Sequence, residues 1–210
     1  MPRLFVALEI GSTAQGRIAD EQKRLAETIR GGGLRWTKYD QLHITLVFIG
    51  QLSDERAAAI VHAMRDPLPH PPFRCALGGL GAFPPRGAPR ALWIGVKSGA
   101  EQLVRVQELV AERLETLGVE RERRPFSPHL TLARWKDSRP SDRPRTTTAS
   151  PATIASVDAR AVTLFQSHVT SAGSTYTALV ECPLEATLRS GASHQGAMDE
   201  LSRDGFRRRP

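Results

Sequence analysis

Two short strings, His43-Ile44-Thr45-Leu46 and His129-Leu130-Thr131-Leu132, repeat the pattern His-apolar-Thr-apolar. An imidazole has an ordinary pKa of about 6.5, so it can donate or accept a proton near neutral pH. One neutral histidine could take a proton from an oxygen that attacks phosphorus, while a protonated histidine gives a proton to the leaving oxygen. Threonine hydroxyls could donate hydrogen bonds to the non-bridging phosphate oxygens. The paired strings therefore predict a phosphoesterase site.

Each string lies in a run that is typical of a β-strand. Side chains alternate between the two faces of a strand, so residues two apart share a face. We expect His43 to project with Thr45, and His129 with Thr131, toward a central cleft. The apolar residues between them, and Phe48 further along the first run, are expected to face a core. Both strings would then place an imidazole and a hydroxyl on a surface with apolar packing behind it.

Other site chemistries find less support. A lone histidine in a strand is more often structural, and the repeat is what favours function. Zinc sites need three or four convergent ligands, and neither string has a second His, Cys or acid at ligand spacing. No P-loop or G-x-G-x-x-G pattern occurs, and neither Ser53 nor Ser127 lies in a G-x-S-x-G setting. We expect acid–base chemistry with no metal and no cofactor. The four histidines outside the strings are interpreted as structural or surface residues: His62, His70, His168 and His194.

The charge of the chain points toward an anionic partner. The formal net charge is +7, and residues 121–145 carry eight Arg and Lys against three acids. Such a segment attracts polyanions through their phosphates. A solvated surface loop would explain the charge equally well, but this segment surrounds the second string, which favours a nucleic acid as the partner.

Composition bounds the class of protein. The 210 residues, 40% of them hydrophobic, suffice for one domain with its own core or two small lobes that share one. Cys75 and Cys182 are too few for a disulfide framework and indicate reduced thiols. No run is long enough to span a membrane, and the N-terminal apolar run ends at Glu9. We expect a cytoplasmic monomer.

The remaining sequence predicts an α+β fold. Ser12 and Thr13 are expected to cap the first helix, Ser53 the second, and Gly118 to end the third. Residues 1–186 would form one bilobal domain with rough two-fold symmetry, its mostly antiparallel sheets lining the cleft and its helices outside. Residues 187–210 are predicted to be a disordered basic tail. The predicted strands are 4–10, 42–50, 73–83, 91–96, 126–135, 156–166 and 176–182, and the predicted helices are 12–29, 54–64 and 101–117.

The two strings and their flanks resemble the two-histidine phosphoesterases. Within that superfamily they are most similar to the RNA 2',3'-cyclic phosphodiesterases, also called the 2'-5' RNA ligase family. The matching runs are Arg3–Ala7, Leu42–Gly50, Arg124–Arg134, Leu164–Ser167 and the turn from Gly173 to Thr177. The resemblance implies a bilobal fold with duplicated sheets and hydrolysis of cyclic phosphate ends of RNA to 2'-phosphates.

The resemblance also implies roles for individual residues. His43 would protonate the leaving 3'-oxygen, His129 would activate water, and Thr45 and Thr131 would hold the phosphate. Arg134 would contact the nucleotide, although strict alternation puts it on the face opposite His129 unless the strand bulges. Two alternatives remain open: a 2'-5' RNA ligase acting on tRNA fragments, and a non-catalytic module that binds RNA ends.

Overall fold

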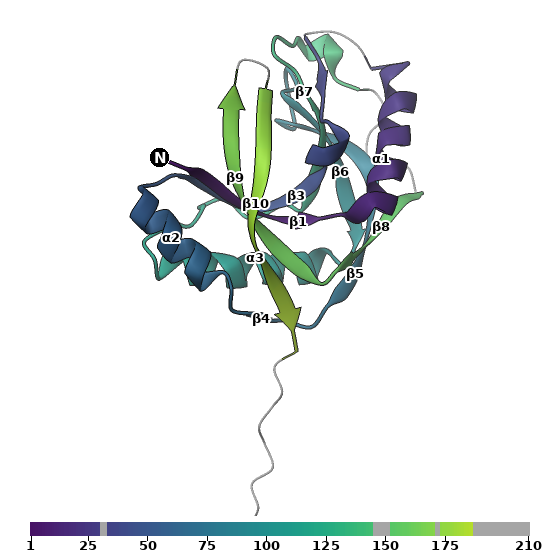
Figure 1. Cartoon of the computed structure of the whole chain (residues 1–210). Helices are drawn as coiled ribbons and strands as arrows, with labels where there is room; N and C mark the ends of the chain where they lie inside the picture. The colour runs from purple at the N-terminus through teal and green to yellow at the C-terminus, as the bar shows by residue number, and fades with distance from the viewer. Residues whose placement is uncertain (30–32, 145–151, 171–172, 187–210) are drawn as a thin grey trace, which may run out of the picture.

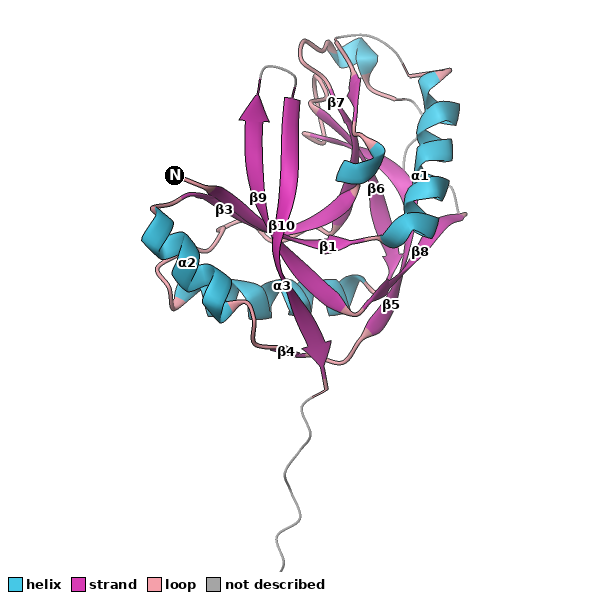
Figure 2. Ribbon diagram, in the orientation of Figure 1, coloured by secondary structure: helices cyan, strands magenta, loops and turns pink. Residues whose placement is uncertain are grey.

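The structure, a computed structural model, describes residues 1–29, 33–144, 152–170 and 173–186 (Figures 1 and 2). The predicted tail, residues 187–210, lies outside the described residues. The strands are β1 (Arg3–Glu9), β2 (Arg35–Trp36), β3 (His43–Gln51), β4 (Leu68–Pro69), β5 (Phe73–Phe83), β6 (Ala91–Ser98), β7 (His129–Arg134), β8 (Thr153–Ala159), β9 (Ala161–Thr170) and β10 (Gly173–Glu185). The helices are α1 (Gly11–Ala26), α2 (Asp54–Ala63) and α3 (Ala100–Glu115), with 3-10 turns at Tyr39–Gln41 and Pro140–Asp142.

Two five-stranded sheets form the two lobes. Their strand orders are β3-β1-β9-β10-β4 and β2-β7-β6-β5-β8, and every pairing is antiparallel except that of β10 with β4. The order β3-β1-β9-β10 in one sheet matches β7-β6-β5-β8 in the other, and each motif begins the first strand of its series. This arrangement confirms the predicted α+β fold of duplicated, mostly antiparallel sheets.

The helices connect the lobes rather than remaining with the strands that precede them. Helix α1 follows β1 of the first sheet but packs against β8 of the second. Helix α3 follows β6 of the second sheet but packs against β3 and β4 of the first. Figure 1 shows α1 beside β8, and α2 and α3 together on another side of the molecule. One continuous cluster of buried apolar side chains therefore serves both sheets.

The ends of the helices agree with the sequence at two places and differ at a third. The Ser53 hydroxyl accepts a hydrogen bond from the backbone of Arg56, at 3.3 Å, as expected of an N-cap. Gly118 has φ 75 and donates from its amide to the carbonyl of Glu115, at 2.9 Å, while the next amide, that of Val119, donates to the carbonyl of Leu114, at 3.1 Å. The expected caps of α1 are wrong, because this helix already begins at Gly11 and no side chain caps it. The helix also ends at Ala26, three residues before its predicted end.

The predicted strand over residues 156–166 is wrong. Residues 153–159 form β8 in the second sheet, Arg160 lies between the strands, and residues 161–170 form β9 in the first sheet. No glycine or proline marks this crossing, so the apolar pattern runs through it without interruption. The two-residue strands β2 and β4 were not predicted either, since pairs of residues carry no periodic signal.

Candidate active site

A cavity of about 500 Å³ lies where the two lobes meet, and the motif residues of both lobes line it. Strand β3 contributes His43 and Thr45, and β7 contributes His129 and Thr131. The two strands are in contact although they belong to different sheets. The apolar residue that follows each motif histidine, Ile44 or Leu130, is fully buried. The structure thus brings together the four residues that period-2 alternation placed on the cleft faces.

The two histidines are held in the same way. The Nδ1 atom of His43 lies 2.8 Å from the carbonyl oxygen of Gln41, and Nδ1 of His129 lies 2.7 Å from the carbonyl oxygen of Ser127. A carbonyl only accepts, so each Nδ1 carries the proton that it donates. The Nε2 atom of each ring is then the site that gains or loses a proton. In both lobes the carbonyl two residues before the histidine fixes the tautomer.

Thr45 completes the first half of the site. Its Oγ1 lies 3.0 Å from Nε2 of His43. With a neutral imidazole the hydroxyl donates this bond, because Nε2 then carries only a lone pair. An anionic oxygen that entered the cavity could take the hydroxyl proton instead.

Aromatic rings surround each imidazole. The ring centroid of His43 lies 5.2 Å from that of Phe5 and 5.5 Å from that of Tyr176. The ring of His129 lies edge-on to Phe83, at 4.9 Å, with Trp93 at 6.2 Å. These rings restrict the orientation of the imidazoles and keep water from part of their surface.

The environment lowers the pKa of both histidines. For His43 burial is the main cause and lowers the pKa to about 4, with the positive charge of Arg134 acting in the same direction. The carbonyl of Gln41 opposes this by favouring the imidazolium. Burial also lowers the pKa of His129, and the charge of Arg134 acts in the same direction, whereas the carbonyl of Ser127 raises it. Without an anion in the cavity, His43 is therefore neutral at pH 7.

A β-bulge at the same place in each motif strand changes which later residue reaches the cavity. Along β3, Thr45 and Val47 pair with consecutive residues of β1, so Leu46 has no partner there. Along β7, Leu132 is likewise the extra residue opposite β6. A one-residue bulge moves the residues beyond it to the opposite face.

The bulges place Phe48 and Arg134 at equivalent positions, five residues after the two motif histidines. Both line the cavity. Arg134, which strict alternation put on the far face, therefore lies on the same side as His129. The expectation that Phe48 faces the core is wrong: its side chain is 69% exposed.

A buried side chain and a strand-end residue hold the second bulge. Gln22 of α1, which is 8% exposed, donates from Nε2 to the carbonyl of Leu132 at 2.9 Å and to that of Thr37 at 3.0 Å. Thr37 donates from its backbone to Leu132, at 2.8 Å, and from its hydroxyl to the carbonyl of Thr131, at 3.0 Å. The backbone of the second motif is thus fixed from outside its own sheet pairing with β6.

Several lining residues were not identified from the sequence. Gln41, whose side-chain amide bonds the carbonyl of Ser174, lies beside the first motif without a motif of its own. Phe5 on β1 and Tyr176 on β10 are far apart in the sequence, and their rings come into contact because both strands belong to the first sheet. The only sequence signal for Phe5 and Tyr176 was that both lie in runs that resemble the 2'-5' RNA ligase family.

Across residues 1–29, 33–144, 152–170 and 173–186, no three His, Cys, Asp or Glu side chains lie close enough together to hold a metal ion. In the same ranges no helix is both long and apolar enough to cross a membrane. Cys75 and Cys182 are buried free thiols.

Comparison with known proteins gives consistent matches. The family model of the 2'-5' RNA ligase superfamily matches residues 18–170. The protein named RNA 2',3'-cyclic phosphodiesterase from Archaeoglobus fulgidus is 33% identical over 174 residues, which are 83% of this chain and 96% of that protein. The protein of the same name from Aeropyrum pernix is 35% identical over 168 residues, 79% of this chain and 94% of its own. The crystal structure of TT0787 from Thermus thermophilus superposes with a TM-score of 0.69 at 25% identity, covering 89% of this chain and all of that one.

Proposed function

Because this chain belongs to the 2'-5' RNA ligase superfamily, we propose that it hydrolyses 2',3'-cyclic phosphate ends of RNA to 2'-phosphomonoesters. The observation that carries the proposal is the pair of imidazoles in one cavity, each with Nδ1 bonded to a carbonyl and each accompanied by a threonine. The relatives from Archaeoglobus and Aeropyrum bear the name of this activity. RNA ends are the proposed partner, tRNA fragments among them.

The proposed reaction needs one base and one acid. His129 takes a proton from water at Nε2, and the water oxygen forms a bond to phosphorus. The bond between phosphorus and O3' breaks, and Nε2–H of His43 gives its proton to O3'. The product keeps the phosphate on O2'. Thr45 and Thr131 donate hydrogen bonds to the non-bridging oxygens as their charge rises.

The phosphodiester itself would help His43 to act as the acid. His43 is neutral in the free site, yet the acid must be protonated. An anionic phosphodiester within a few ångströms favours the charged imidazole and raises its pKa. Binding of the substrate would therefore make His43 take up from solvent the proton that it later transfers. The Thr45 hydroxyl, released from Nε2, turns to the phosphate.

The test of metal-independent acid–base catalysis is turnover of a 2',3'-cyclic nucleotide in excess EDTA, with the product identified as 2'- or 3'-phosphate. His43→Ala and His129→Ala should each lower kcat by roughly 10²–10⁴. His62→Ala, on the exposed side of α2, is the matched control. Loss of activity with the chelator, or a 3'-phosphate product, would overturn the proposal.

A second experiment separates the acid from the base. In a cyclic substrate whose bridging O3' is replaced by sulfur, the leaving thiolate needs little protonation. His43→Ala should regain most of its activity on this substrate, whereas His129→Ala should not. The opposite pattern would exchange the two roles and leave the overall activity standing.

A 2'-5' RNA ligase is the second candidate function. In ligation a 5'-hydroxyl of a second RNA end replaces water: the base takes its proton, its oxygen bonds to phosphorus, the bond between phosphorus and O3' breaks, and the acid protonates O3' to leave a 2'-5' linkage. The matching carbonyl contacts of the two histidines favour this function, because the two rings exchange the roles of acid and base when the linkage is cleaved again. Rates on 2'-5' linked dinucleotides, compared with rates on cyclic ends, measure this activity. We also propose that the chain acts as a monomer and that it is cytoplasmic; its two buried free thiols are in keeping with a reducing compartment.

A further inference from the structure

A second and larger cavity opens from the catalytic one. Its volume is about 1000 Å³, and five residues line both cavities: Thr45, Phe48, His129, Thr131 and Arg134. It extends between β3, helix α3, the turn after β5 and the segment of residues 119–127. The catalytic histidine of the second motif thus stands at the junction of two spaces, and a ligand longer than one nucleotide could occupy both.

The walls of the second cavity are basic. Five arginines and two glutamates line it. Phe83, Pro84 and Phe126 add apolar surface on which a base could stack. Phosphates beside arginines and bases on apolar faces are the usual features of sequence-tolerant binding to single strands.

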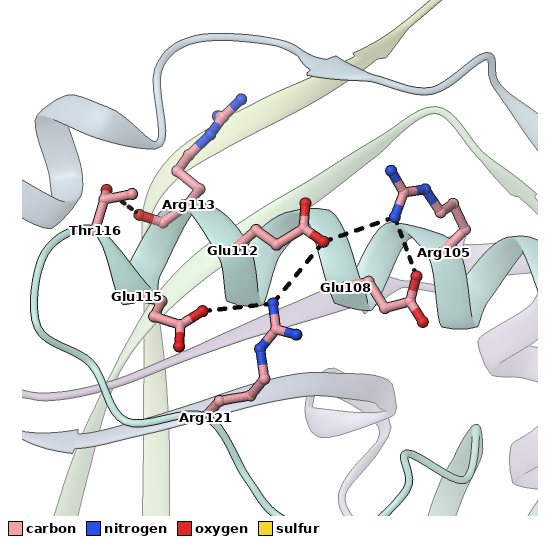
Figure 3. Close-up of polar contacts among 7 residues, drawn as sticks. All are labelled: Arg105, Glu108, Glu112, Arg113, Glu115, Thr116 and Arg121. Carbon is pink, nitrogen blue, oxygen red and sulfur yellow. Dashed lines mark hydrogen bonds and ion pairs between the residues drawn. The ribbon is translucent and has the colours of Figure 1, made fainter.

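Ion pairs anchor one wall and use two of the arginines. Arg121 reaches Glu112 and Glu115 of α3, at 3.9 and 3.6 Å, as Figure 3 shows. Glu112 also meets Arg105 at 3.7 Å, so the wall joins a small network on the helix (Figure 3). Arg124 pairs with Glu122 at 3.4 Å.

Hydrogen bonds to backbone carbonyls hold the start of the same wall. The amide of Val119 donates to the carbonyl of Leu114, and the side chain of Arg56 donates to the carbonyls of Leu117 and Gly118. The segment therefore begins from a fixed position at the end of α3.

Three arginines of this cavity have no acidic partner within the described part of the chain: Arg90, Arg123 and Arg134. Arg134 belongs to the catalytic cavity as well. Arg90 and Arg123 are exposed and line only the larger cavity, Arg90 in the turn after β5 and Arg123 in the segment beyond α3. Their charges are available to an incoming anion.

We propose that the larger cavity binds the RNA chain that leads to the cyclic end, with Arg90 and Arg123 contacting phosphates on the 5' side of the terminal ribose. The inference rests on the proposed function, since it needs the cyclic phosphate between the two motif histidines. A cyclic mononucleotide has a single phosphate and fills the catalytic cavity. Each added nucleotide brings one more phosphate to the basic walls. The enzyme is then selective for RNA ends over free cyclic nucleotides.

The experiment compares kcat/KM on a 2',3'-cyclic mononucleotide with kcat/KM on a trinucleotide that has the same cyclic end, at 50 and 200 mM salt. Each phosphate contact to a single strand gives a slope of about −0.7 in log–log salt dependence. Two contacts predict that the rise in salt lowers kcat/KM about sevenfold more for the trinucleotide than for the mononucleotide.

Variants assign that difference to the two arginines. Arg90→Ala and Arg123→Ala should each remove a factor of about 2.6 from the extra salt dependence, and together they should make the two substrates respond alike. Arg90→Lys and Arg123→Lys keep the charge and should retain most of the effect. Arg17→Ala, an exposed arginine of α1 that lines neither cavity, is the control. Unchanged rates on the mononucleotide show that each variant is folded and catalytically intact.

The outcomes separate this inference from the function on which it rests. If the mononucleotide is hydrolysed but the trinucleotide shows the same kcat/KM and the same salt dependence, the larger cavity does not bind the chain. The same conclusion follows if the double variant keeps the trinucleotide's extra salt dependence. If neither substrate is hydrolysed, the proposed function itself is wrong.

Discussion

The low pKa of His43 makes the stability of the fold depend on pH in a defined window. The folded protein holds the imidazole neutral down to about pH 4, whereas the unfolded chain takes up the proton at its ordinary pKa of 6.5. Between these two values the unfolded state binds more protons, so the free energy of unfolding falls as the pH falls. A shift from 6.5 to about 4 corresponds to about 3 kcal/mol. That contribution is fully present above pH 6.5 and lost by pH 4.

The substitution that isolates this effect is His43→Gln. Glutamine does not titrate, so the variant should lose the part of the pH dependence that His43 causes, while carboxylates contribute equally to both proteins. Urea unfolding at half-unit steps from pH 7 to pH 4 measures the difference. The free energy of unfolding of the variant minus that of wild type should rise by about 3 kcal/mol between pH 7 and pH 4. His62→Gln serves as the control for removal of an imidazole.

The titration can also be observed directly. The ring proton signals of His43 should shift by NMR near pH 4 in the free protein, and at a higher pH with inorganic phosphate in the cavity. By linkage, phosphate should bind more tightly as the pH falls through this window. A midpoint near 6.5 in the free protein, or equal pH slopes for wild type and His43→Gln, would refute the reasoning that burial in the aromatic pocket controls this group.

Three further substitutions probe the surroundings of the site, and a fourth, in α1, serves as a contrast. Gln22→Met removes the hydrogen bond to Leu132, so it should lower the free energy of unfolding by about 1–2 kcal/mol. It should also lower kcat/KM, because the bulge that positions Arg134 loses its support, and this loss should be smaller in an Arg134→Ala background. Fully additive effects in the double-mutant cycle would show that Gln22 does not act through Arg134. Phe48→Ala should leave the melting temperature nearly unchanged, because the ring is exposed, but raise KM roughly tenfold if a base stacks on it; an unchanged KM would exclude that contact. Gly81→Ala would place a Cβ 2.1 Å from the tryptophan ring beside His129 and should cost about 1–3 kcal/mol, whereas Gly16→Ala, with open space around it, should stabilise α1 by about 0.5–1 kcal/mol in the same melting assay.

The sequence predicted the parts of the site that depend on local alternation. His43 with Thr45 and His129 with Thr131 reach the cavity because two residues along a strand return to the same face. The buried residues behind them follow from the same rule. Ser53 and Gly118 were likewise predictable, since a helix cap depends on a few neighbouring residues.

What the sequence could not predict depends on pairing between distant strands. The bulges at Leu46 and Leu132 arise from register against β1 and β6, and no residue type at either position marks them. They decide where Phe48 and Arg134 point, and strand alternation alone would place Arg134 on the wrong face, whereas the family resemblance implies that it reaches the site. Gln22 reaches the second motif from α1, more than a hundred residues away in the chain, as the hydrogen bond to Leu132 records.

The exchange of helices between the sheets affects how this protein can come apart. The apolar stripe of α1 is covered by a strand of the other sheet, and Arg160 alone separates β8 from β9. Neither half of the chain contains a complete sheet together with the helix that shields it. The two lobes should therefore lose their structure in a single cooperative transition, and a fragment comprising one repeat should not fold by itself. We therefore expect the two lobes to behave as one thermodynamic unit, which would keep the two histidines in a constant relative position.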